Sequence, residues 1–268
     1  MGAVQLACSA LAFNSLPLAE ACARVRAMGF SAIDLGVFDQ PGLGHVTAME
    51  ATEHMLEVEE RIRTIAAEAG VGIAAIAADA VDDDPAVVQK RMATVCLLAH
   101  RLGARALTVM AGDATLDEAV AQLLPLYEVG ARYGVAIGVE TVSGTLTGRP
   151  KMAAELLARV PGLRLTLDPA HLVVQGQSLA DWRHLMTSVA HVHVRDAGPG
   201  NIKKLQVDWG TGGVKVADLL RELDAGDYEG WLTVEYVEPG LLPGTVTDAA
   251  AQAAKARTGL LEALGATP

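Results

Sequence analysis

The stretch Leu163-Arg-Leu-Thr-Leu-Asp-Pro-Ala-His171 alternates apolar and polar side chains and then presents a carboxylate and an imidazole. The alternation is typical of a β-strand, and a tight turn after it would let Asp168 and His171 point into the same space. One carboxylate and one imidazole placed in this way suit a divalent cation. Asp-x-x-His alone is weak evidence for such a site, so its meaning depends on the rest of the chain.

Three other stretches have the same form, a β-like run that ends in a carboxylate or an imidazole. They are Gly134-Val-Ala-Ile-Gly-Val-Glu140, Val189-Ala-His-Val-His193 and Gly230-Trp-Leu-Thr-Val-Glu235. In a parallel barrel the carboxyl ends of all strands meet at one mouth. Four ends in the order Glu, Asp-x-x-His, His and Glu are what such a mouth needs to hold one metal ion.

Short β-like runs alternate with longer helix-like runs along the whole chain. Strands are expected at 4–10, 30–37, 71–78, 104–110, 135–140, 163–168, 190–195 and 231–236. Helices are expected near 17–28, 52–69, 82–102, 117–133, 150–159, 179–188, 214–224 and 246–264. Glycine precedes several strands, at Gly70, Gly103 and Gly134, and marks the same helix-to-strand turn each time.

Eight βα units in roughly 250 residues is the size of a (β/α)₈ TIM barrel, and we expect one such domain over residues 1–268. A doubly wound open sheet is the main rival. Against it, no Gly-x-Gly-x-x-Gly follows the first strand. The polar strand ends are also spread over the second half of the chain instead of gathering at one crossover.

Composition limits the class of protein. Hydrophobic residues make up 51% and charged residues 20% of the 268 residues, as in a globular chain with a sizeable core. The formal net charge of -11 opposes approach to a phosphate backbone, so nucleic acid and an anionic membrane are poor candidate partners. No apolar run reaches the ~20 residues that cross a bilayer.

The cysteines and the N-terminus indicate the compartment. Cys8, Cys22 and Cys96 are too few and too scattered for a disulfide framework or a zinc knuckle, and we expect them to be small buried hydrophobes in a reducing environment. The first basic residue is Arg24, so the chain lacks the charged opening of a secretory signal. We therefore expect a cytoplasmic protein.

An ordered set of motifs resembles a known family. The set comprises Glu140, Asp168-Pro-Ala-His171, His191-Val-His193-Val-Arg-Asp196, Val207-Asp-Trp-Gly-Thr-Gly-Gly213 and Gly230-Trp-Leu-Thr-Val-Glu235. It resembles the xylose isomerase-like TIM barrel superfamily, in particular its sugar isomerase and epimerase branch around D-tagatose 3-epimerase and inosose isomerase. The similarity covers essentially the whole chain, and the ordered set is more specific than any one motif.

The resemblance implies one divalent metal ion at the barrel mouth, with Mn²⁺ as the first candidate and Mg²⁺, Co²⁺ or Zn²⁺ as alternatives. Carried over by position, its ligands would be Glu140, Asp168, His193 and Glu235. His193 is preferred to His191, which lies deeper in the barrel and is expected to be a satisfied core residue.

Substrate recognition is where the chain departs from the family. His171 matches a histidine that approaches substrate in the sugar epimerases, and Asp34, at the end of the second strand, is a further substrate-binding candidate. Several epimerases of the family carry a second Glu or a His shortly after the strand-five glutamate, and this chain lacks it. They also carry an arginine a few residues after the strand-seven histidine, where this chain has Ala197-Gly-Pro-Gly200. The segment 197–213, with Lys204 and Trp209, is a candidate replacement that would overhang the mouth. A solvated loop is the equal alternative.

The residue types also suggest a reaction. Oxygen-rich ligation suits Mn²⁺ or Mg²⁺, which would stabilise an enediolate, and Glu140 and Glu235 on opposite sides would form an acid/base pair. We expect a metal-dependent isomerase or epimerase of a sugar, keto-polyol or related polyhydroxylated carbonyl compound. We expect its partner to be a small sugar-like molecule. The sequence leaves open whether the protein forms a homo-oligomer.

Three alternatives remain. A dehydratase of a keto-inositol or dehydroshikimate type substrate would eliminate water after the same proton abstraction. A DNA repair enzyme like endonuclease IV shares the barrel, but it needs more histidines for a three-zinc cluster and a basic face for DNA. A non-catalytic barrel that binds metal or sugar is the third.

Overall fold

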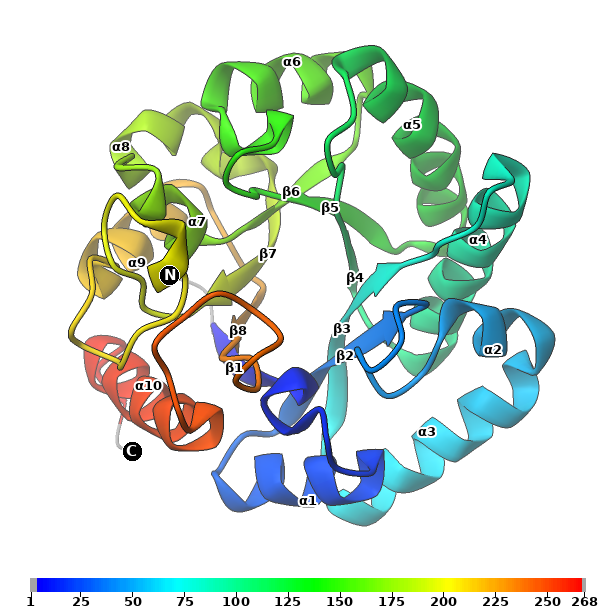
Figure 1. Ribbon diagram of the computed structural model, residues 1–268, viewed down its shortest axis with the longest axis horizontal. Coiled ribbons are helices and arrows are strands. Elements are labelled where there is room, and N and C mark those ends of the chain that lie inside the picture. Colours follow the sequence, from blue (N-terminus) through cyan, green and yellow to red (C-terminus); the bar gives the residue numbers. More distant parts are fainter. Residues whose placement is uncertain (1–3, 267–268) are drawn as a thin grey trace.

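The computed structural model describes residues 4–266, in which eight parallel strands close into a barrel in the order β1 to β8. The strands are β1 Gln5–Ser9, β2 Ala32–Phe38, β3 Gly72–Asp79, β4 Ala106–Val109, β5 Ala136–Glu140, β6 Arg164–Leu167, β7 Val189–Val194 and β8 Trp231–Val234. Helices surround the barrel on its outside (Figure 1). The predicted (β/α)₈ fold is confirmed.

The helices follow the strands in sequence. The α-helices are α1 Leu18–Ala27, α2 Ala48–Glu53, α3 Met55–Ala69, α4 Pro85–Leu102, α5 Leu116–Tyr133, α6 Pro150–Arg159, α7 Pro169–Val174, α8 Leu179–Trp182, α9 Val216–Ala225 and α10 Ala249–Ala263. Short 3-10 helices are η1 Ala10–Phe13, η2 Leu146–Gly148, η3 Arg183–Ser188 and η4 Ile202–Lys204.

The expected helix-to-strand turn recurs in the structure. Gly70, Gly103 and Gly134 end α3, α4 and α5 in the left-handed conformation, with φ of 68°, 77° and 70°. A side chain would disfavour this conformation, which explains why glycine recurs there. Each turn reverses the chain toward the amino end of the next strand.

Three segments differ from the sequence prediction. The helix expected at 52–69 begins earlier and is broken at His54, whose φ of -132° and ψ of 37° are not helical. The helix expected at 179–188 is one short α-helix followed by η3. The turn expected after Asp168 is the helix α7, with proline at its first position. Asp168 caps α7 by accepting a hydrogen bond from the Ala170 N–H at 2.8 Å.

The alternation of side chains along each strand separates the core from the site. Apolar residues such as Leu35, Leu107 and Leu165 are fully buried in the main core, whereas polar residues of neighbouring register face each other inside the barrel. Thr166 in β6 pairs with His191 in β7, and His193 pairs with Thr233 in β8. The barrel interior is therefore polar toward its carboxyl end.

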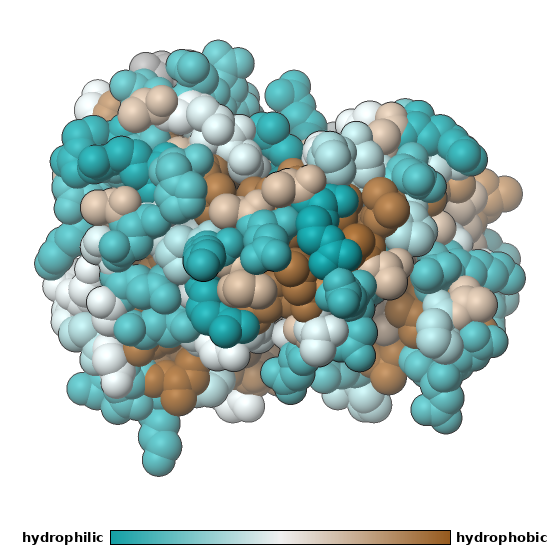
Figure 2. Space-filling view, turned by 90° about the horizontal axis from the view of Figure 1, so that it is seen from above, coloured by the Kyte–Doolittle hydropathy of each residue, from teal (hydrophilic) through white to brown (hydrophobic). Residues whose placement is uncertain are grey.

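The outer surface agrees with a helix-covered barrel. The face shown in Figure 2 is largely hydrophilic, with apolar side chains in small patches, as expected of helices that bury one side. No helix within residues 4–266 is long and apolar enough to span a membrane. Cys8, Cys22 and Cys96 are all buried free thiols, which confirms their predicted place in the core.

Candidate active site

A cavity of about 240 Å³ lies at the carboxyl ends of the strands. Its polar lining includes Glu140, His171, His193, Arg195 and Glu235, and the rest of its lining is mostly apolar. A second cavity of about 310 Å³, between α4 and α5, is larger but contains none of the predicted site residues. The smaller cavity is therefore the candidate active site.

Strand β7 and the residue after it supply three inward-facing side chains in a row. His191, His193 and Arg195 are two residues apart, so they lie on the same face of the strand and rise from the barrel interior toward the mouth. Their rings and guanidinium are almost completely buried, at 1% exposure for each residue. Because a buried cation or imidazole requires polar partners, the surrounding carboxylates define the site.

His193 lies at the centre of these carboxylates. Its Nδ1 is 2.9 Å from Glu140 Oε1 and 3.2 Å from Glu235 Oε2, and its Nε2 is 3.1 Å from Asp34 Oδ2. Burial alone would lower the pKa of His193, but Glu235, Asp34 and Glu140 together raise it well above its usual range. Burial likewise opposes ionisation of Glu140, yet His193 lowers the pKa of Glu140 to about 2, so Glu140 is a carboxylate at neutral pH.

Asp34 lies beneath His193, outside the cavity lining. Its Oδ2 contacts His191 Nε2 at 2.9 Å as well as His193 Nε2, and the residue is 2% exposed. Although burial opposes its ionisation, the two histidines lower the pKa of Asp34 far below the usual range. The structure thus places Asp34 where it orients His193, instead of at the surface where substrate would contact it.

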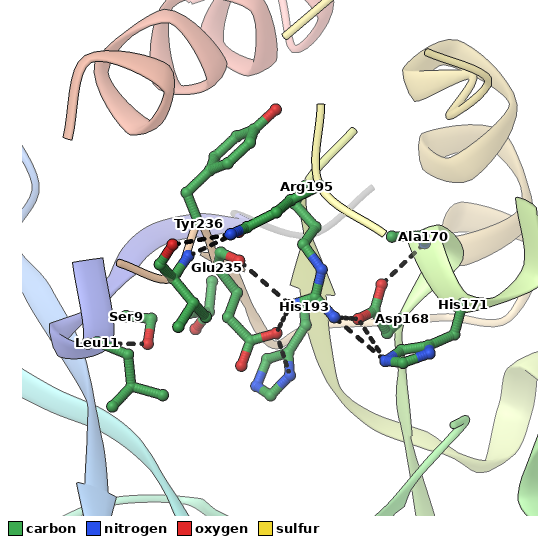
Figure 3. Close-up of polar contacts among 12 residues, drawn as sticks. Ser9, Leu11, Asp168, Ala170, His171, His193, Arg195, Glu235 and Tyr236 are labelled. Atoms are coloured by element: carbon green, nitrogen blue, oxygen red, sulfur yellow. Dashed lines mark hydrogen bonds and ion pairs between the residues drawn. The ribbon is translucent and has the colours of Figure 1, made fainter. Parts of the chain in front are cut away.

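Arg195 joins two of the predicted ligands (Figure 3). One guanidinium nitrogen pairs with Glu235 Oε2, and the other lies 2.6 Å from Asp168 Oδ2 and 3.2 Å from His171 Nε2. The sequence reasoning assigned Arg195 no role in the site. Its position two residues after His193 on the same face of β7 was the signal that could have identified it.

His171 is held from behind by the loop after β5. The Ser143 N–H donates to His171 Nδ1 at 3.1 Å, and the Ser143 hydroxyl lies 2.9 Å from the same nitrogen. Burial lowers the pKa of His171, so the ring is neutral, and acceptance at Nδ1 leaves its proton on Nε2. Nε2 lies 3.7 Å from Asp168 Oδ2 and 3.2 Å from the Arg195 guanidinium, and since Nε2–H and the guanidinium are both donors in this tautomer, no hydrogen bond joins Nε2 to Arg195.

The donor set fits a divalent cation. Glu140, His193 and Glu235 can each offer one ligand atom within 4.8 Å of the others, and Glu140, Asp168 and His171 form a second such group. One oxygen of Glu140 and one of Glu235 converge on His193 Nδ1, at 2.9 and 3.2 Å, and these residue types are ones that a divalent ion would accept as ligands. Three acidic side chains, Glu140, Asp168 and Glu235, thus surround one imidazole and one guanidinium, and burial raises the pKa of Asp168.

Two predicted substrate residues lie away from the cavity. The stem of Lys204 packs over Gly198, and the indole of Trp209 lies against Gly259 in α10. Neither belongs to the cavity lining. The loop between β8 and α10, drawn in orange in Figure 1, instead lies over β8 and β1 at the mouth and contributes Leu241 and Leu242 to the lining.

The segment 197–213 is tied down by Asp196. The carboxylate of Asp196 accepts hydrogen bonds from the backbone N–H groups of Gly210, Gly212 and Val214 at 3.0, 2.7 and 3.1 Å. A Cβ atom at Gly212 would lie 2.3 Å from Asp196 Oδ1, so glycine is required for this close approach. The glycines of this segment therefore serve an anchored turn.

Comparison with known proteins agrees with this architecture. The fold and the polar barrel mouth define a TIM barrel with an acidic and histidine-rich site, and residues 22–262 match the family of xylose isomerase-like TIM barrels. The chain belongs to this family. No curated protein sequence matches it significantly. Membership of this family identifies the chain as an enzyme.

Solved structures with the same fold include enzymes of two reaction types. An L-ribulose 3-epimerase aligns with a TM-score of 0.72 and 19% identity, over 98% of this chain and 96% of that chain. The 3-keto-D-glucoside 4-epimerase of E. coli has a TM-score of 0.70 and 16% identity, over 97% and 99%. A probable 3-DHS dehydratase from Bacillus anthracis has a TM-score of 0.72 and 17% identity, over 95% and 99%.

Proposed function

We propose that the protein is a divalent-metal-dependent isomerase or epimerase of a sugar, keto-polyol or related hydroxycarbonyl compound, acting by proton transfer through an enediolate. The observation that carries the proposal is the approach of Glu140 from β5 and Glu235 from β8 to the same nitrogen of His193, inside one cavity. Residues that would hold the ion are Glu140, Asp168, His193 and Glu235. Mn²⁺ is the first candidate because the donors are mainly oxygen.

Each glutamate has one oxygen left for proton transfer. Glu140 uses Oε1 toward His193, and Glu235 uses Oε2 toward His193 and Arg195. Within residues 4–266 the other oxygen of each has no protein partner, so it can face a substrate in the cavity. The two glutamates can then remove a proton on one side of the reacting carbon and return one on the other. A divalent ion, when bound, supplies the positive charge that stabilises the enediolate.

The remaining polar groups position the substrate. The His171 N–H can donate to a substrate oxygen, and the Ser143 contacts fix the direction of the ring. Arg195 places a positive charge in the cavity wall and holds Glu235 and Asp168 in place.

The test is isotope exchange in D₂O. Ketoses would be incubated with Mn²⁺-loaded protein, and NMR would follow deuterium at the carbon next to the carbonyl. Proton transfer predicts deuterium in the product, and Glu140→Gln or Glu235→Gln should lower kcat by roughly 10²–10⁴-fold with a smaller change in substrate affinity. The Mn²⁺ content of each variant is the control for metal loss. A product without deuterium at early and late times would decide against this mechanism.

A dehydratase is the second candidate, favoured by the shared fold of the probable 3-DHS dehydratase. It would use the same first step but would expel a neighbouring hydroxyl as water. The same NMR experiment separates the two reactions, because elimination creates a new carbon–carbon double bond whereas epimerisation changes only stereochemistry. The net charge of -11 argues against the DNA repair alternative.

A further inference from the structure

The cavity has two chemically different walls. One wall consists of the charged and imidazole side chains from β5, β7, β8 and α7. The opposite wall consists of apolar side chains, namely Leu11, Phe38, Leu43, Ala77, Val237, Leu241 and Leu242, which form one hydrophobic cluster. We call this cluster the apolar wall.

The apolar wall comes from η1, from the ends of β2 and β3, and from the loops after β2 and β8. Leu11 lies in η1 after β1, Phe38 ends β2, and Leu241 and Leu242 lie in the loop between β8 and α10. Leu11 and Phe38 are each 5% exposed. Their packing against each other and against Val237 makes the apolar wall part of the fold.

Hydrogen bonds of the backbone and of side chains hold these segments together. The Glu238 N–H donates to the Leu11 carbonyl at 3.0 Å, and the Glu238 carboxylate accepts from the Ser15 N–H at 2.8 Å and the Ser15 hydroxyl at 2.6 Å. On the other side, Gly44 has φ of 79°, and a Cβ there would lie 3.0 Å from the Phe38 ring. Glycine thus lets the loop after β2 close directly over Phe38.

Hydroxyl groups of a substrate would find few partners on this side. Besides the charged wall, the polar residues of the lining are Gln40 and Thr108. The Thr108 hydroxyl is 2.8 Å from the Thr166 hydroxyl, with which it shares a hydrogen bond inside the barrel. A hydroxyl moved from water to the apolar wall would lose hydrogen bonds without replacement, which disfavours binding.

We propose that the substrate is a small α-hydroxyketone whose reacting end meets the charged wall and whose other end is apolar, such as a ketose that ends in a methyl group instead of a hydroxymethyl group. This inference rests on the proposed function, because that function places the hydroxycarbonyl end at Glu140 and Glu235. The cavity volume of about 240 Å³ limits the apolar end to a methyl or short alkyl group, since ligand pockets are usually roughly 300–1,000 Å³.

The test uses matched pairs of ketoses that differ in one hydroxyl group. L-rhamnulose and L-fructose form one pair, and L-fuculose and L-tagatose form the other; the first member of each lacks the hydroxyl at carbon 6. Dissociation constants would be measured by calorimetry with Mn²⁺-loaded protein, and kcat/KM by NMR. Because an apolar pocket discriminates an added hydroxyl by roughly 10–100-fold, we expect a preference of that size for the deoxy member in both binding and kcat/KM.

A pair of leucine variants links the preference to the apolar wall. Leu242→Asn should reduce the preference for the deoxy ketose, because its amide offers a partner to the extra hydroxyl. Leu56→Asn, at a surface leucine of α3 that is 65% exposed, should leave the preference unchanged. If the two variants changed the preference for the deoxy ketose equally, the apolar wall would not contribute to substrate recognition, and the inference would be overturned.

The outcomes separate the inference from the proposed function. Equal or tighter binding of the hydroxylated ketoses overturns the inference, while deuterium exchange in the same ketoses would still support the proposed function. Tighter binding of the deoxy ketoses without any exchange supports the apolar wall as a recognition surface and counts against the proposed reaction. Binding of neither member of either pair also overturns the inference.

Discussion

Arg195 is the most constrained charged residue of the site. Its guanidinium is buried together with the carboxylates of Asp168 and Glu235, and its Nε has no partner in the described part of the chain. Without this cation, three carboxylates would share one buried space. The guanidinium therefore offsets the repulsion between the carboxylates that it joins.

The first prediction concerns the stability of the metal-free protein. Arg195→Met should lower its free energy of unfolding by about 3–5 kcal/mol, because the change leaves buried carboxylates unpaired. The measurement is urea unfolding in EDTA. Arg24→Met is the control, since Arg24 and Glu20 form an exposed pair with side chains 59% and 46% exposed, and its effect should stay below about 0.5 kcal/mol. Similar losses for both variants would contradict the role given to Arg195.

Asp34 acts on the site through the histidine above it. A carboxylate that contacts Nε2 keeps the ring of His193 in one orientation and one tautomer, with Nδ1 directed at Glu140 and Glu235. The sequence prediction placed Asp34 against substrate. From its burial and its contacts we propose instead that Asp34 positions His193, the proposed metal ligand.

The second prediction follows from this position. Asp34→Asn should weaken Mn²⁺ binding by roughly 10–100-fold, as is usual when the partner of a metal-binding histidine is altered. Calorimetric titration of the metal-free variant with Mn²⁺ measures the effect. Asp218→Asn, a change at a half-exposed residue of α9, serves as the control. Unchanged Mn²⁺ affinity in Asp34→Asn would show that His193 needs no such support.

At the scale of elements, His45 links the loop after β2 to η1. Its Nε2 lies 3.3 Å from the Phe13 carbonyl, whereas its buried Nδ1 has no partner within residues 4–266. Burial lowers the pKa of His45 although the Phe13 carbonyl opposes the shift. Protonation would bury a second N–H group without an acceptor, so the folded protein favours the neutral ring.

The third prediction is a pH dependence with a defined sign. Because the pKa of His45 is lower in the folded protein than in the unfolded chain, its contribution to stability is present above the unfolded pKa of about 6.5 and is lost as pH falls below it. Unfolding in urea at pH 7.5 and 5.5 should show a smaller loss in His45→Gln than in the parent. His54→Gln, at a half-exposed histidine, is the control. An identical pH dependence in all three proteins would contradict the prediction.

The regular elements could be predicted because their signals are local. Glycine at positions such as Gly70 and Gly134 marks the ends of helices, and strand alternation places Glu140, His193 and Glu235 at the inner ends of strands. The break at His54 could not be predicted in this way. Neither residue 53 nor residue 55 is a helix breaker, so the break depends on how α2 and α3 pack.

The loops could not be predicted because their paths depend on distant contacts. Lys204 and Trp209 are close in sequence to β7, but Asp196 directs their segment outward to Gly198 and α10. The loop after β8 lies at the mouth because Glu238 is bound to Ser15, which is 223 residues away in sequence. No periodic pattern in either loop indicates these contacts, so the apolar wall could be seen only in the structure.

At the scale of the whole molecule, the site depends on closure of the barrel. Four neighbouring strands position the four proposed ligands: Glu140 ends β5, Asp168 directly follows β6, His193 lies in β7, and Glu235 directly follows β8. The barrel closes because β8 pairs with β1. The unfolded chain cannot hold these four side chains together at an acceptable cost in conformational entropy. A metal ion bound by them would therefore stabilise the closed barrel as a unit.

The last prediction tests this coupling. Mn²⁺ at 100 times its dissociation constant should raise the free energy of unfolding by about 2.7 kcal/mol, because it binds the folded state alone. Urea unfolding with and without EDTA measures the change, and hydrogen exchange should show added protection in strands on both sides of the barrel, β1 to β8, since they open together. His193→Ala removes a ligand from the centre of the site and should abolish the Mn²⁺ effect, whereas His100→Ala, outside the site, should keep it. An equal gain in His193→Ala and the parent, or protection confined to one loop, would place the ion elsewhere.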